Sequence, residues 1–423
     1  MGITRRDLGR LLGAGLLVPR PLLAATPSQR KFLFVFCAGG WDPTYVFTPT
    51  LSDPDVWTDP DAAPAEAGGI PYLSAPDRPA VDTFFEAWGD RTALINGIEV
   101  RSITHEACRR IIWTGGTDSA ADDWAARIAG NSGEHWALPD LVLSGPAYSA
   151  EYSGAVMRVG PDGQLGKLVT GLALDESDQP AAPLSSFTTT AIEDFLAARA
   201  EDLVARAAPG SEASFAQAYT RSLERLDAVR AIGADLSLAS LTEDYVHVRD
   251  RIRPAIRLLA ENRSRCVVAE HLGQWDIGWD SHSNIGKQND HYQVLMEDLH
   301  SILDELAVTP AAGGGVLLDE VTVVVMSEMG RAPWLNTLGG KDHWTFTTAM
   351  LIGAGIRGGT VVGAYKDGLV GASVDLDTGL SSASGVRLTS THLGATLAAI
   401  GGLDPSIVAP GADPLWAVLS DGA

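Results

Sequence analysis

An unbroken apolar run, Phe32-Leu33-Phe34-Val35-Phe36-Cys37, constrains the fold more than any other stretch of the chain. Its residues favour β structure, and a strand without polar positions is buried on both faces, as in the parallel sheets of α/β proteins. Gly39 and Gly40 follow almost at once and allow a sharp turn. The run therefore predicts the first strand of a parallel sheet that is covered on both sides.

Other segments fit the same arrangement. Five further stretches are short, apolar and rich in β-forming residues: 92–98, 141–143, 266–268, 321–326 and 349–353. Between residues 268 and 321, seven apolar residues recur at helical spacing: Tyr292, Leu295, Met296, Leu299, Ile302, Leu303 and Leu306. This spacing predicts an amphipathic crossover helix, and residues 391–400 predict a late helix. Strands that alternate with helices indicate a layered α/β protein.

Two regions differ from this pattern. Residues 190–262 hold long segments of Ala, Leu, Glu and Arg with few β-formers, which predict helices near 191–208, 212–232 and 242–262. We interpret this region as a helical insertion or cap within one domain that covers residues 26–423. Residues 48–80 are rich in Pro, Asp and Ala and predict a long, irregular excursion on the surface.

Residues 1–25 have the composition of an export signal. Arg5 and Arg6 precede a short apolar run at residues 11–18, whereas a membrane span needs about 20 apolar residues. Paired arginines in this position resemble the twin-arginine signal, which exports folded proteins. We therefore expect the twin-arginine export machinery as a partner, a periplasmic or secreted location, and membrane contact only if the signal is retained. A basic start to a cytosolic helix is the alternative.

Charge and cysteine content restrict the partners further. A net charge of -22 disfavours nucleic acid or an anionic membrane surface as the main partner. Cys37, Cys108 and Cys266 provide neither a disulfide framework nor a cysteine–histidine zinc cluster. Any bound metal would therefore be held by oxygen and nitrogen ligands.

Four short patches contain glycine together with a carboxylate or an imidazole: residues 40–42, 278–282, 327–331 and 340–343. Three of them closely follow an apolar run. Because loops that leave one edge of a parallel sheet converge on one crevice, we expect these side chains to meet there. Oxygen and nitrogen ligands suit a hard or borderline divalent cation, so the patches predict a metal-dependent hydrolase.

The first two patches supply three candidate ligands. Asp42 follows the first predicted strand, where it either binds a metal or caps a turn. Asp280 and His282 are separated by one residue, so both side chains can point to one side of an extended loop. Asp276 and the pair Asp290-His291 are rival ligands.

The other two patches add four candidates. Glu328 directly follows a β-rich run, and a solvated loop glutamate is the alternative. Arg331 suits a bidentate contact with an anionic group, or an ion pair with Glu328. Asp342 and His343 lie together in a loop that begins with two glycines and form another candidate ligand pair.

In this order, the patches resemble the exported domain-of-unknown-function 1501 family, itself assigned to the alkaline phosphatase and sulfatase-like superfamily. The matching segments are the twin-arginine start and residues 39–42, 278–282, 327–331 and 340–344. The resemblance implies an alkaline-phosphatase-like three-layer sandwich with a largely parallel sheet. It also implies one or two divalent metal ions (zinc, manganese or calcium) and hydrolysis of a small anionic phosphate or sulfate ester.

The resemblance further implies roles for the candidates. Asp280, His282 and His343 correspond to ligands of a first metal, and Asp42 and Glu328 to ligands of a second. Met329 stands where the superfamily usually has histidine, which weakens the second site. Asp342 is therefore the expected substitute ligand.

In sulfatase-like chains, the nucleophile lies nine residues before a Thr-Gly pair. Counting back from Thr114-Gly115 leads to His105, next to Thr104. Thr104 takes the role if the turn is shifted by one residue, whereas His105 acts as nucleophile or ligand. A helix N-cap followed by a first-turn histidine is the structural alternative.

The expected function is therefore an exported metal-dependent hydrolase of phosphate or sulfate esters, with Thr104, His105 and Arg331 as catalytic candidates. One alternative is a non-catalytic exported protein that binds a metal or ligand on the same fold, and Met329 favours it. Another is a redox enzyme with a cofactor, but the sequence contains no flavin, haem or iron–sulfur motif.

Overall fold

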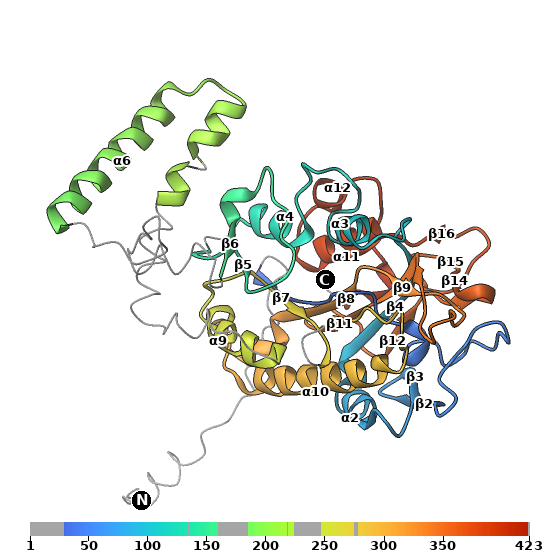
Figure 1. Cartoon of the computed structure of the whole chain (residues 1–423). Helices are drawn as coiled ribbons and strands as arrows, with labels where there is room; N and C mark the ends of the chain where they lie inside the picture. Colours follow the sequence, from blue (N-terminus) through green and yellow to red (C-terminus); the bar gives the residue numbers. More distant parts are fainter. Residues whose placement is uncertain are drawn as a thin grey trace, which may run out of the picture.

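The computed structural model describes residues 29–133, 136–159, 185–217, 219–223, 247–274 and 278–421. Its centre is an eight-stranded sheet in the order β12-β4-β11-β8-β1-β7-β5-β6 (Figure 1). The strands are β1 (Lys31–Cys37), β4 (Thr92–Glu99), β5 (Asp140–Val142), β6 (Val156–Arg158), β7 (Cys266–His271), β8 (Val321–Ser327), β11 (Phe346–Gly353) and β12 (Thr360–Val362).

The predicted first strand lies in the middle of this sheet. All seven residues of β1 are buried, and β7 and β8 flank it in parallel. The pairs β12–β4, β5–β6 and β5–β7 are also parallel, whereas β11 runs antiparallel to both β4 and β8. The chain between β8 and β11 turns back through the short strands β9 (Gly330–Arg331) and β10 (His343–Trp344), without the crossover helix that a parallel pair needs.

Side chains along β1 alternate between two cores. Leu33, Val35 and Cys37 pack in the core that also contains buried residues of α2 (Pro79–Trp88), α9 (Val248–Ala260) and α10 (Lys287–Val308). Phe32, Phe34 and Phe36 pack in the core beneath α3 (His105–Thr114), α4 (Trp124–Gly130) and α11 (Ser390–Ile400). The protein is thus a mixed α/β structure, with a mostly parallel sheet between two helical layers, as predicted (Figure 1).

The crossover helix is also confirmed. All seven apolar residues that predicted it lie buried in α10, and α11 corresponds to the predicted late helix. In the helix-rich region, α6 (Ser186–Arg206) buries Ala200 and is otherwise largely exposed, and Figure 1 shows it standing away from the sheet layers. Part of the helix predicted at 212–232 lies outside the described residues.

Residues 48–80 differ from the expected irregular excursion. They contain the hairpin of β2 (Ala63–Ala67) and β3 (Ile70–Ser74), which turns at Gly68-Gly69. Tyr72 packs its ring 4.6 Å from that of Phe85 on α2. Alanine and proline are poor strand formers, so composition did not indicate β2.

The expected signal at residues 1–25 lies outside the described residues and stays a prediction. Within the described part of the chain, no helix combines the length and the apolar character that a membrane crossing requires. The three cysteines are free and buried, which agrees with the absence of a predicted disulfide framework.

A candidate metal centre at the strand ends

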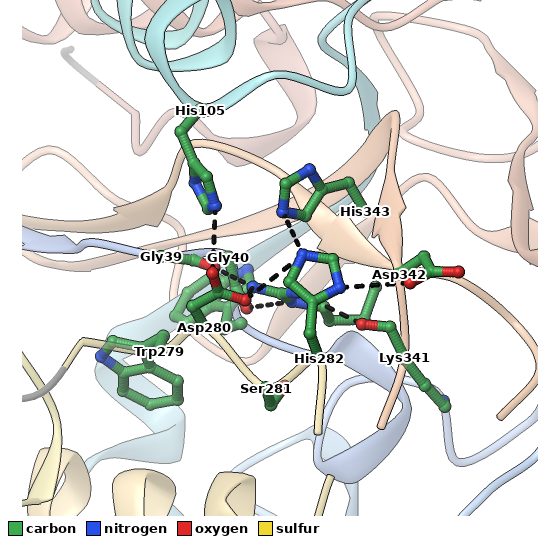
Figure 2. Close-up of polar contacts among 12 residues, drawn as sticks. Gly39, Gly40, His105, Trp279, Asp280, Ser281, His282, Lys341, Asp342 and His343 are labelled. Atoms are coloured by element: carbon green, nitrogen blue, oxygen red, sulfur yellow. Dashed lines mark hydrogen bonds and ion pairs between the residues drawn. The ribbon is translucent and has the colours of Figure 1, made fainter. Parts of the chain in front are cut away.

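The candidate ligands converge at one edge of the central sheet. The loop after β1, the segment after β8 and the start of α3, which follows β4, all lie at the carboxyl ends of parallel strands. The antiparallel β11 begins at the same edge, so β10, which precedes it, brings His343 there. Figure 2 shows His105, His282 and His343 arranged around Asp280.

The three histidines share one arrangement of their ring nitrogens. Each has Nδ1 near an oxygen: His105 at 3.0 Å from Glu328, His282 at 3.1 Å from Asp342, and His343 at 2.6 Å from the carbonyl of Ile103. A carbonyl or an ionised carboxylate can only accept a hydrogen bond, so each ring donates from Nδ1. A neutral ring held in this way presents the lone pair of Nε2 to the site.

The Nε2 atoms point to a common region. Those of His282 and His343 are 2.8 Å apart, and two lone pairs at this distance repel each other unless a proton or a cation lies between them. Asp280 completes the cluster, with its carboxylate 3.4 Å from Nε2 of His105 and 3.5 Å from Nε2 of His282. Ligand atoms of His105, Asp280 and His343 all lie within 4.8 Å of one another.

The cluster also sets its own protonation. Hydrogen bonds with Asp280 and then Glu328 raise the pKa of His105 to about 9. Burial opposes ionisation of Asp280, but the hydrogen bond with His105 and the charge of Arg331 together lower its pKa. Burial also lowers the pKa of His343. Without a metal, His105 is therefore protonated at neutral pH, and its Nε2 proton faces Asp280.

Glu328 orients one of the three histidines. Its carboxylate is fully buried. It accepts hydrogen bonds from the backbone N–H of Gly39 at 2.8 Å and from Nδ1 of His105. Burial would raise the pKa of Glu328, but the hydrogen bond with His105, a backbone hydrogen bond and the charges of Arg109 and His105 together lower it. Glu328 thus stays ionised and fixes the ring of His105.

Arg331 is engaged by protein groups on every side. It is fully buried, donates from Nε to the carbonyl of Gly40 at 2.9 Å, and also donates to the carbonyl of Gly39. The same nitrogen that donates to Gly39, Nη2, lies 3.0 Å from Asp280. Arg331 therefore holds the glycine turn and orients Asp280.

Asp42 and Thr104 lie apart from the histidine cluster. Asp42 is fully buried, accepts both the N–H and the hydroxyl of Thr44, and lies 2.8 Å from Nζ of Lys341. Thr104 occupies the N-cap position of α3, is exposed, and has its hydroxyl 3.5 Å from that of Ser102.

The rival ligands also fall elsewhere. Asp290 and His291 lie in the first turns of α10, where Nδ1 of His291 accepts the N–H of Gln274 at 2.8 Å. Asp276 lies outside the described residues. Sequence reasoning missed Gln288, a fully buried residue whose side chain donates to the carbonyl of Trp279 and accepts the N–H of Asp42. Gln288 thereby connects residues 278–282 with the loop after β1.

A pocket of about 560 Å³ opens beside the cluster, a size that suits a small molecule. Its lining combines the site residues His105 and Asp280 with Arg109, Tyr148 and Leu272. Sequence reasoning missed Arg109, although it lies four residues after His105 and so shares its helix face. The cluster is therefore accessible to a ligand from one side.

Gly39 allows the closest backbone approach in the site. It has φ +118°, and a Cβ there would lie 2.6 Å from the backbone nitrogens of Trp279 and Asp280. We expect Gly39→Ala to lower the free energy of unfolding by about 1–3 kcal/mol and to weaken metal binding, because Asp280 must shift. Urea unfolding of both proteins measures the first effect, and unchanged stability would contradict it.

Fold and site together define an α/β protein with a candidate centre of three histidines and one aspartate at its strand ends. The chain belongs to the DUF1501 family of proteins of unknown function, whose family model matches residues 29–378. This confirms the family resemblance inferred from the sequence patches. The search of curated proteins found no match.

Two solved structures resemble the chain distantly. One belongs to work on glycosaminoglycan metabolism in Bacteroides thetaiotaomicron, with 8% identity, a TM-score of 0.37, and coverage of 89% of this chain and 74% of the other. The second is a protein in complex with its substrate D-glucosamine-2-N,6-O-disulfate, with 10% identity, a TM-score of 0.32, and coverage of 91% and 81%. Likeness at this level says nothing of activity or substrate.

Proposed function

We propose that this protein is an exported, metal-dependent hydrolase of phosphate or sulfate esters. The observation that carries the proposal is the shared orientation of His105, His282 and His343, each anchored at Nδ1 and each directing Nε2 to one region. Metal-binding histidines characteristically donate their other ring N–H to a carboxylate or a carbonyl. Export rests on the composition of residues 1–25.

The geometry supports one cation with four ligands: Nε2 of His105, His282 and His343, and the carboxylate of Asp280. Glu328 and Asp342 then act as outer partners that orient two of the rings. Asp42 is already neutralised by Lys341, which disfavours the second metal that the family resemblance implied. Three imidazoles suit zinc, or manganese less well, and disfavour calcium, which prefers oxygen ligands.

The protein groups have separate tasks in this proposal. When bound, a divalent cation polarises the ester and makes water nucleophilic at neutral pH. Arg331 keeps Asp280 in place, and Glu328 holds the proton on Nδ1 of His105. Thr104 has no part, because its exposed hydroxyl faces Ser102. The neighbouring pocket holds the organic part of the substrate.

Metal binding should be coupled to proton release. His105, with its pKa raised to about 9, is protonated at about pH 7.5, so a cation that binds Nε2 must displace that proton. We expect release of roughly one proton from His105, and metal affinity that increases with pH until about pH 9. Calorimetry of zinc binding in buffers of different ionisation enthalpy measures the number of protons released. A zinc affinity that does not change between about pH 6 and 9 would contradict the prediction.

The function itself is tested on protein expressed without residues 1–25. Metal content is measured first, and aryl phosphates and aryl sulfates are then offered to metal-loaded and to chelator-treated protein. We expect hydrolysis of at least one ester class by the loaded protein and its loss on chelation. A loaded protein that hydrolyses neither class would reject the enzyme proposal.

One observation favours a non-catalytic metal-binding protein as a second candidate. Met329, at the position where the superfamily usually has histidine, is fully buried in a small core cluster with Val100, Cys108 and Ile111. It faces apolar neighbours rather than the centre. Retention of metal without hydrolysis in the same screen would support this candidate.

A further inference from the structure

Arg109 forms part of the pocket wall next to the candidate metal centre. It lies one helical turn after His105 on α3, with its side chain 40% exposed. Its Nε is buried, lies 3.6 Å from Glu328 and has no hydrogen-bond partner in the part of the chain that the structure describes. Because Nε is buried while 40% of the side chain is exposed, a ligand in the pocket would contact the terminal Nη nitrogens.

The position of Arg109 relative to the centre is defined by two contacts. Glu328 touches Nε of Arg109 on one side and Nδ1 of His105 on the other, at 3.6 and 3.0 Å. One carboxylate and one imidazole ring thus separate the guanidinium from the convergent Nε2 atoms. A ligand with an aromatic or sugar ring has a comparable span.

The remaining lining indicates what kind of group Arg109 would bind. Leu272 and Tyr148 provide apolar surface for the body of a ligand, and Arg110 covers the Tyr148 ring at 4.5 Å. Glu106 belongs to the same lining, so the wall is not uniformly positive. An anion there needs a directed contact, which a guanidinium provides to carboxylate or sulfate oxygens.

We propose that Arg109 forms a second anion subsite, so that the preferred substrate is an ester whose organic part carries an additional carboxylate or sulfate. This inference rests on the proposed ester hydrolase function, because it places the ester itself at the metal. Arg109 is a specificity-determining residue in this arrangement. It takes no part in bond cleavage.

Binding of non-hydrolysable phosphonates to the zinc-loaded protein tests the proposal. Phenylphosphonate carries the metal-binding group alone, and 4-carboxyphenylphosphonate and 4-sulfophenylphosphonate add one remote anion each. We expect one of the latter two to bind about 10- to 100-fold more tightly than phenylphosphonate, as a charge-assisted hydrogen bond predicts. The larger gain identifies the preferred anion.

Arg109→Gln should remove this gain while zinc content and phenylphosphonate affinity stay near wild type. Arg109→Lys should keep part of it, because the charge remains but the bidentate contact is lost. Arg91→Gln is the matched control: Arg91 is 38% exposed and also pairs with a carboxylate, that of Asp319. It should leave the gain intact.

The outcomes separate the two proposals. If phenylphosphonate binds but neither remote anion adds affinity, or the gain survives in Arg109→Gln, the subsite is wrong and the metal proposal stands. If phenylphosphonate does not bind, the proposed function fails. Benzoate and benzenesulfonate then decide the subsite: binding that Arg109→Gln abolishes supports it, and absent or unaffected binding overturns it.

Discussion

The Asp280→Ala/His282→Ala variant should purify without stoichiometric metal, whereas the wild-type protein retains about one equivalent of a divalent ion. The two substitutions remove half of the proposed ligand set. Loss of an outer partner alone typically costs 10–100-fold in metal affinity, so we expect a decrease of more than about 100-fold here. Elemental analysis and competition with a chromophoric chelator measure the effect.

A matched control is available on α10. The half-buried His300 and the exposed Asp304 form a pair 3.4 Å apart, and their replacement by alanine removes the same residue types away from the cluster. This variant should retain wild-type metal content. Asp342→Asn, which removes the charge of the carboxylate that anchors His282 and also accepts from Asn336, should show an intermediate affinity. Wild-type metal content in the Asp280→Ala/His282→Ala protein would reject the proposed centre.

Lys341→Met should reduce stability strongly. Lys341 and Asp42 form a fully buried ion pair at 2.8 Å, and Nζ also donates to the Thr44 hydroxyl and the carbonyl of Trp57. Removal of one partner leaves a buried charge uncompensated, which costs about 3–5 kcal/mol in the free energy of unfolding. Chemical denaturation of the metal-free proteins measures this cost.

The double variant Asp42→Asn/Lys341→Met separates charge from packing. It removes both charges at once, so we expect it to be more stable than Lys341→Met alone. Equal stability of the single and double variants would show that the ion pair does not carry the effect. Metal affinity should also fall in Lys341→Met, because the next two residues, Asp342 and His343, belong to the centre.

The sequence was most informative where only one kind of secondary structure can bury the apolar residues. An unbroken apolar run such as residues 32–37 fits a central strand, and the seven apolar positions of α10 fit one helix face. Convergence of the strand-end loops followed from the parallel sheet. The direction of β11 did not follow, because a short apolar run carries no information on strand orientation.

Partners within the site were less accessible to prediction. Asp42 was a reasonable ligand by position, but its ion pair with Lys341 joins residues 299 positions apart, which local spacing does not reveal. Likewise, Glu328 and Asp342 follow ligand-like patterns, yet in the structure they face Nδ1 of His105 and His282. A single sequence does not distinguish a ligand from the residue that orients it.

The ligands of the candidate centre come from α3, the segment before α10, and β10. They span residues 105 to 343, so no short fragment of the chain contains the whole set. A bound ion would cross-link these three segments and stabilise the folded state relative to the unfolded chain. Metal occupancy would then report complete folding of the sheet, and metal loss would expose the connecting loops to proteases before the core strands unfold.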